Sequence, residues 1–217
     1  MKSIVMHLTG GPRPLFEEGF NNAPLHNVVW DALGRSGDLD GILSANKNIV
    51  DTKRIVYRFD AAEPIIKAFN ASIVRASADT DANPMRKDGL RWIPKINGEF
   101  SVPVLSIHTL GDMYVPFMME QIYRQRATVK GTQANLVQRA IRAPGHCDFT
   151  IIEQSSAFAD MVKWVETGVK PAGDDVLTAS VLAQPNYGCT HTNNSTGMDD
   201  RPVVKSSRSN GTLPACQ

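Results

Sequence analysis

Two segments in the middle of the chain have the pattern of buried strands, and each stops at a glycine-containing loop that carries a polar residue. Residues 102–109 (VPVLSIHT) are almost uniformly apolar and are followed by Asp112. Residues 136–141 (LVQRAI) form the second run, and His146 follows them. Parallel strands buried on both faces have such sequences, and side chains at their carboxyl ends share one edge of the sheet. We therefore predict that Asp112 and His146 lie within hydrogen-bonding reach, about 2.6–3.2 Å, at the ends of adjacent strands.

Helical periodicity separates and follows these strands. Residues 117–128 are predicted to form a helix between them, and residues 150–168 a second helix after His146. Gly168 suits the C-terminal cap of the second helix. This helix has one broad apolar face, made of Ile151, Ile152, Phe158, Met161, Val162 and Val165. Residues 100–168 thus predict two β-α units and an α/β fold class, with too few strands for a self-sufficient sheet.

The flanking regions have a different character. Short amphipathic helices are predicted around the turn-forming residues 10–14, and residues 38–94 are predicted to be mostly helical, with helix starts at 38–40 and 60–63. Residues 172–217 are rich in Asn, Ser, Thr, Gly and Pro and predict a poorly ordered tail without a catalytic group. The predicted organisation is therefore a helical segment over 1–99, a core over 100–171 and a tail over 172–217.

Composition excludes several functional classes. The chain of 217 residues is 42% hydrophobic and 21% charged, typical of a soluble globular protein, and its net charge of +1 gives no electrostatic case for a nucleic-acid partner. No stretch approaches the roughly 20 apolar residues that span a bilayer, so no membrane partner is expected. The N-terminus has no signal-peptide pattern, which predicts a cytoplasmic protein if the chain is expressed as written. No Cys or His spacing suggests zinc, and no metal or cofactor is expected.

Three cysteines are present. Cys189 and Cys216 lie in the predicted tail, where a bridge between them would hold it near a turn at 187–189. An odd count leaves one thiol over, so the redox compartment is undecided. Cys147 directly follows His146 and is expected to be held within the fold. Because sequence neighbours rarely present both side chains to one reacting atom, we do not expect Cys147 to be a nucleophile.

Three sequence segments carry a resemblance to a known family. They are the acid loop within VPVLSIHTLGDMYVP (102–116), the histidine loop within GHCDFTIIE (145–153) and the segment WVETGVKP (164–171). Together they resemble the C-terminal half of an α/β-hydrolase, closest to bacterial esterase/lipase-like and peptidase-like members. The match covers about 100–171, and residues 10–14 with 38–70 resemble the cap segment of such enzymes less specifically. The resemblance implies an incomplete α/β-hydrolase fold preceded by a helical cap-like segment.

The same resemblance implies that Asp112 is the acid and His146 the base of a catalytic triad. Its nucleophile, on a G-x-S-x-G turn between strand and helix, has no counterpart here. The nearest string, Gly34-Arg35-Ser36-Gly37-Asp38, lacks the second glycine in place and follows a predicted helix. We therefore expect that the chain corresponds to an α/β-hydrolase without its N-terminal half. It would be the product of a truncated gene, an incomplete reading frame or a genuinely reduced protein.

Two functions follow as hypotheses. The first is hydrolysis of a small carboxylic ester, including lactones, in which His146, oriented by Asp112, deprotonates a serine or a water. The second is a non-catalytic remnant that forms homo-oligomers or pairs with another chain through the exposed strand 102–109 and an apolar face. In that case His146 is a structural histidine and Asp112 an ordinary turn residue.

Overall fold

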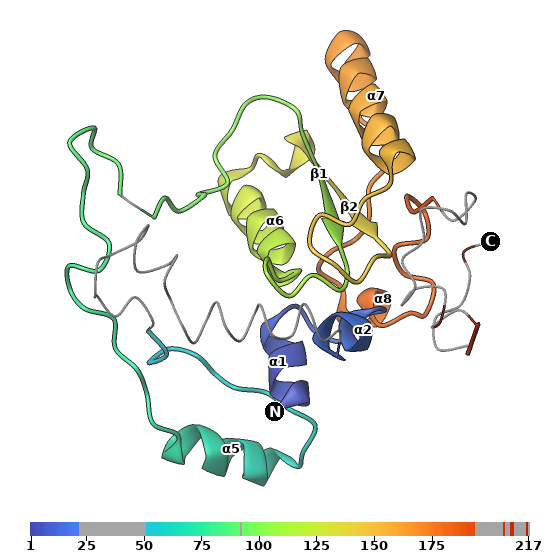
Figure 1. The fold of residues 1–217 in the computed structure, drawn as a ribbon. Helices are drawn as coiled ribbons and strands as arrows, with labels where there is room; N and C mark the ends of the chain where they lie inside the picture. Colours follow the sequence, from blue (N-terminus) through green and yellow to red (C-terminus); the bar gives the residue numbers. More distant parts are fainter. Residues whose placement is uncertain (22–50, 92, 194–205, 207–208, 211–215, 217) are drawn as a thin grey trace. The chain divides into compact units, whose positions relative to one another are not determined.

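The computed structural model describes residues 1–21, 51–91, 93–193, 206, 209–210 and 216 (Figure 1). Contacts divide the chain into two compact units. The first unit comprises Met1–Leu8 and Asn27–Ile96, and the second comprises Thr9–His26 and Asn97–Gln217. None of the helices within the described residues has the length and apolar character needed to cross a bilayer.

The first unit contains helices α1 (Lys2–Leu8) and α5 (Glu63–Ser72). The predicted helix start at 60–63 is confirmed, because α5 begins at Glu63. Ser3 of α1 bonds to the segment that precedes α5: its hydroxyl donates to the Asp60 carboxylate at 2.8 Å and accepts from the Asp60 backbone N–H at 2.9 Å. The predicted start at 38–40 lies outside the described residues.

The prediction that residues 38–94 are mostly helical is wrong for the described residues around α5. Residues 51–62 and 73–91 contain no helix. Asparagine side chains hold this backbone instead. Asn70 donates to Tyr57 O at 2.7 Å and accepts from Tyr57 N at 2.8 Å, and Asn83 pairs in the same way with Ile93. Such side-chain bonds satisfy backbone groups outside regular structure and so compete with helix formation.

A two-stranded parallel sheet forms the centre of the second unit. Strand β1 (Val104–Thr109) pairs with β2 (Leu136–Ile141) in a continuous register from Val104 opposite Leu136 to Thr109 opposite Ile141. Helix α6 (Met118–Lys130) and the 3₁₀ turn η1 (Gln133–Asn135) connect the strands, and helix α7 (Ile151–Thr167) follows β2. Both predicted strands and both predicted helices are therefore confirmed within a few residues.

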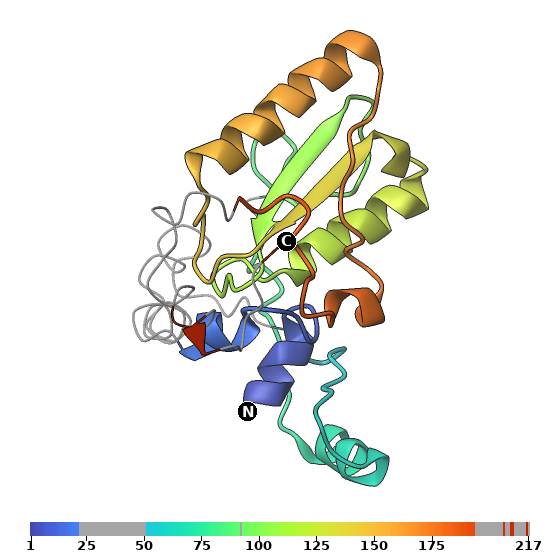
Figure 2. The same cartoon turned by 90° about the vertical axis from the view of Figure 1, so that its right-hand side faces the viewer.

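The two helices cover opposite faces of this sheet (Figure 2). Ser106 and Gln138, which are register partners, both hydrogen-bond to Glu120 of α6. The next pair along the strands, Ile107 and Arg139, points the other way, because side chains alternate along a strand. Arg139 donates to Asp160 of α7 at 2.6 Å. A β-α-β unit with α6 on one face of its sheet, followed by α7 on the other face, thus accounts for the layering.

Helix α7 has clear ends and an unexpected apolar face. Thr150 and Glu153 form a capping box at its start, and Gly168 ends it with φ 71°. The side chains that it buries are Glu153, Ala157 and Trp164. The apolar face predicted from periodicity is instead largely exposed, at positions Ile151, Ile152, Phe158, Val162 and Val165. Its partner surface is not present among the described residues.

The prediction of a poorly ordered tail is wrong for residues 172–193. Helix α8 (Ala179–Leu182) lies in this segment, and Val176, Leu182 and Tyr187 belong to the main core cluster. Few apolar residues suffice here because each is almost fully buried against the core. The remainder of that cluster is Leu15, Leu110, Phe117 and Ala140. A disulfide joins Cys189 to Cys216, a pairing that the sequence left open.

The same segment covers the outer edge of β2. Asp174 N donates to Gln138 O at 2.7 Å, and its carboxylate accepts from Ala140 N at 2.8 Å. Further along, Arg142 N donates to the Thr192 hydroxyl at 2.9 Å. This segment therefore provides hydrogen-bond partners for backbone groups of β2 that are not paired with another strand. The segment boundaries predicted at residues 99 and 171 differ from those of the compact units. Residues 9–21 belong to the same unit as the sheet.

Leu182 tests whether the C-terminal segment is part of the core. Its side chain is 1% exposed, so Leu182→Ala should lower the free energy of unfolding by about 2–5 kcal/mol, as cavity-forming core substitutions do. Leu177→Ala is the matched control, because Leu177 is 42% exposed and should cost less than about 1 kcal/mol. Urea unfolding measures both. Equal, small effects would show that the segment does not pack as described.

Candidate active site

The acid loop begins where β1 ends and holds its carboxylate by backbone groups. Asp112 is 3% exposed. Its Oδ1 accepts hydrogen bonds from Tyr114 N at 2.8 Å and Val115 N at 3.0 Å. These two bonds fix the carboxylate in one orientation and leave Oδ2 for a further partner.

His146 is that partner. Its Nδ1 lies 2.7 Å from Asp112 Oδ2. A carboxylate only accepts hydrogen bonds, so Nδ1 carries the proton and Nε2 has a free lone pair in the neutral ring. The predicted geometry is therefore confirmed: the acid and the histidine follow adjacent parallel strands and are hydrogen-bonded.

The parallel pairing of the strands continues into the two loops and brings these side chains together. Leu110 N donates to Ile141 O at 2.9 Å and Gly111 N donates to Ala143 O at 3.0 Å. The Thr109 hydroxyl donates to Gly145 O at 2.7 Å. Three hydrogen bonds thus join the two chain segments just before Asp112 and His146.

Gly111 permits this close approach. A Cβ added there would lie 2.6 Å from Pro144 Cα and 2.8 Å from Leu15 O. Gly19, in helix α2 (Phe16–Asn21), packs against the same point, since its Cβ would lie 1.9 Å from Gly111 O. The crossing of three backbone segments therefore requires a residue without a side chain at 111.

Arg13 supplies a buried positive charge behind the acid loop. Its Nε donates to Leu110 O at 2.7 Å, and its guanidinium carbon lies 5.3 Å from the Phe16 ring centroid and 5.8 Å from that of Phe117. Burial lowers the pKa of Arg13 to about 10, and attraction to Asp112 opposes that shift. Arg13 therefore stays charged at neutral pH. Residues 10–14 were predicted as a turn, and no role was predicted for Arg13.

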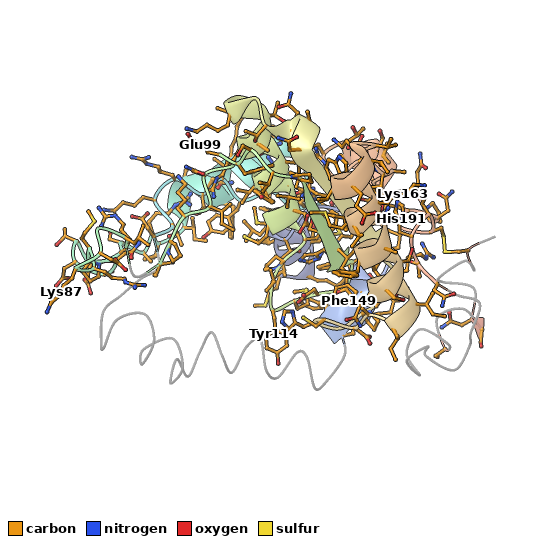
Figure 3. The ribbon with its side chains drawn as sticks, turned by 90° about the horizontal axis from the view of Figure 1, so that it is seen from above. Lys87, Glu99, Tyr114, Phe149, Lys163 and His191 are labelled. Atoms are coloured by element: carbon orange, nitrogen blue, oxygen red, sulfur yellow. A yellow bond between two sulfur atoms is a disulfide. The ribbon has the colours of Figure 1, made fainter. Side chains whose placement is uncertain are left out.

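The other side of the His146 ring faces outward. The side chain is 42% exposed, and the Tyr114 ring centroid lies 5.4 Å from that of His146. Figure 3 shows Tyr114 and Phe149 at the end of the second unit away from Glu99, where the chain leaves the strands. The imidazole Nε2 is thus positioned to meet a substrate or a water at this end.

Cys147 departs from the sequence expectation. It is exposed, and its Sγ lies 3.5 Å from His146 Nε2. Cys147 has φ 52°, a left-handed conformation that is uncommon outside glycine. In this conformation the Cys147 side chain lies against the ring of the preceding residue, His146. At this turn the side chains of two sequence neighbours therefore lie next to each other, contrary to our expectation.

His108 of β1 is buried, with Nδ1 2.9 Å from Thr109 O and its ring in an edge contact with the Phe117 ring. Ser155 is exposed and bonds within its own helix to Ile151 O at 2.7 Å. Ser36 lies outside the described residues. In the described part of the chain, no three His, Cys, Asp or Glu side chains converge as metal ligands.

Comparison with known proteins finds one hydrolase-named relative. The chain is 31% identical over 91 residues to a protein named o-phthalyl amidase from Xanthobacter agilis. That match spans 42% of this chain and 20% of the relative, so the chain covers about a fifth of that protein. No protein-family model and no solved structure matches. The similarity is consistent with a hydrolase and says nothing of the bond hydrolysed here.

Gly111 provides a test of how the loops are held. Gly111→Ala should lower the free energy of unfolding by about 1–3 kcal/mol, the usual cost of overpacking, because its methyl group would overlap Pro144 and Leu15. Gly145→Ala is the control in the neighbouring loop, since its Cβ meets atoms no nearer than 3.4 Å. Thermal or urea unfolding compares the two. A harmless Gly111→Ala would contradict the described crossing.

Proposed function

We propose that the chain is part of an α/β-hydrolase and that it hydrolyses carboxylic esters, including lactones, with His146 as general base and Asp112 as the residue that orients it. The observation that carries this proposal is the 2.7 Å hydrogen bond from His146 Nδ1 to the buried Asp112 carboxylate. The amidase name of the partial relative supports a hydrolytic reaction at a carbonyl group. Small acyl compounds are the proposed substrates.

The mechanism follows from the tautomer. Asp112 holds the proton on Nδ1, so Nε2 accepts a proton from the attacking group, which is a water or a hydroxyl. The attacking oxygen adds to the carbonyl carbon and forms a tetrahedral intermediate. When that intermediate collapses, Nε2–H returns the proton to the departing alkoxide. Asp112 stabilises the imidazolium in between, and Arg13 offsets the cost of burying the carboxylate.

Substitution of the pair tests the proposal. His146→Ala should lower kcat/KM for p-nitrophenyl acetate by about 10²–10⁴, the usual contribution of a general base. Asp112→Asn should cost a comparable or smaller factor, because it favours the wrong tautomer. Ser155→Ala is the control, since its hydroxyl is exposed and bonded within α7. Full activity of His146→Ala would refute the mechanism.

Substrate class is tested in the same assay. A small lactone and an o-phthalyl amide, the latter taken from the name of the partial relative, extend the comparison beyond simple esters. Esters should react fastest, because an alkoxide leaves more readily than an amine. An enzyme that acts on the amide alone would redirect the proposal from esters to amides.

A second candidate function is self-assembly, and a specific observation favours it. Ile151, Phe158 and Val165 of α7 are 81%, 71% and 62% exposed, and they recur at helical spacing to form a stripe. The described residues contain no strand on the free edge of β1. Open strand edges and apolar stripes are templates for pairing. We propose a second copy of the chain as the occupant.

Light scattering after size-exclusion chromatography tests assembly. The chain should elute at about twice its monomer mass of 23.7 kDa, and Phe158→Lys with Val165→Lys should return it to the monomer. Lys163→Ala is the control on the same helix, because Lys163 is exposed and outside the stripe. A monomeric parent protein would contradict assembly and leave the catalytic proposal untouched.

A further inference from the structure

We propose that Cys147 is the nucleophile of this site and that the reaction passes through a thioester on its sulfur. This inference rests on the proposed function, because it uses the same base and the same acyl substrates. It replaces the attacking water or hydroxyl with a group on the chain itself.

Three side chains form the required series. Asp112 Oδ2 lies 2.7 Å from His146 Nδ1, and His146 Nε2 lies 3.5 Å from Cys147 Sγ. This is the order acid, base and nucleophile that activates a serine or cysteine, here made by residues from two loops. The thiol donates to the one imidazole nitrogen that the acid leaves unprotonated. A serine supplied from elsewhere would need the same nitrogen.

Access and chemistry favour a reacting sulfur over a structural one. Cys147 is exposed, whereas inert structural cysteines are typically buried. All three cysteines of the chain lie in described residues, and the other two are joined as Cys189–Cys216. Cys147 is therefore the one free thiol of the chain, which makes its labelling unambiguous.

The reaction balances with water as co-reactant. The Cys147 thiol passes its proton to His146 Nε2 as the sulfur adds to the ester carbonyl carbon. Collapse of the tetrahedral adduct breaks the carbon–oxygen bond, and Nε2–H protonates the departing alkoxide. Nε2 then deprotonates a water, which adds to the thioester carbonyl. The sulfur departs from this second adduct and recovers the proton, so that the acid product and the free thiol are released.

Mass spectrometry and burst kinetics with p-nitrophenyl acetate test the inference. The parent chain should release up to one equivalent of p-nitrophenolate in a burst and carry one acetyl group, which peptide mapping places on Cys147. Cys147→Ala should lose the burst and the adduct and fall to the activity of His146→Ala. Because nucleophile and base act as a unit, the double variant should be no slower than either single variant.

Controls separate this inference from the proposed function. His146→Ala keeps the exposed thiol, so acetylation at the parent rate in that variant would show simple chemical labelling and overturn the inference. Full turnover by Cys147→Ala with loss in His146→Ala would also overturn it and leave the base mechanism standing with water. Loss in neither variant would refute both. Ser155→Ala should retain the burst and the adduct.

Discussion

The parallel hydrogen bonding between β1 and β2 does not stop at the ends of the strands, and the site depends on that continuation. Gly111 N reaches Ala143 O, and the Thr109 hydroxyl reaches Gly145 O. The two loops therefore leave the sheet side by side rather than diverging. Asp112 and His146 meet because their loops are already joined, and the absence of a side chain at 111 is what lets the segments cross.

Several buried polar groups around this centre are paired with one another. Glu120 accepts from Ser106 and Gln138, so a hydrogen-bonded cluster lies on the face of the sheet beneath α6. Arg13 lies between aromatic rings and beside the acid loop, with its charge opposed by Asp112. Paired groups of this kind cost little stability when satisfied and much when one member is removed. They hold the small core in one arrangement.

The sequence predicted the β-α units and the meeting of Asp112 with His146, because strand period, glycine position and loop order are local signals. It did not predict the packing of Tyr187 and Leu182, since a few apolar residues in a polar segment carry no periodicity. Arg13 was missed because two of its partners, Leu110 O and the Phe117 ring, are distant in the chain. The contact of Cys147 with His146 was not predicted, because it depends on a left-handed backbone conformation that no residue type requires.

The helical expectation for 51–94 failed for a related reason. Asn70 and Asn83 satisfy extended backbone through side-chain bonds, which hydrophobic spacing does not register. The sequence correctly predicted that α7 has an apolar face. It did not predict that this face is exposed, because burial also requires a partner surface. Periodicity identifies a face that can be buried, and the remainder of the structure decides whether it is.

The orientation of His146 is the central physical claim, and a proton–nitrogen NMR spectrum of the histidine side chains measures it directly. Assignment by comparison with His146→Ala identifies the ring among the five histidines. We predict that neutral His146 is protonated at Nδ1, with a downfield proton protected from exchange by the hydrogen bond to Asp112. A ring protonated at Nε2, or one averaging between tautomers with a freely exchanging proton, would contradict it.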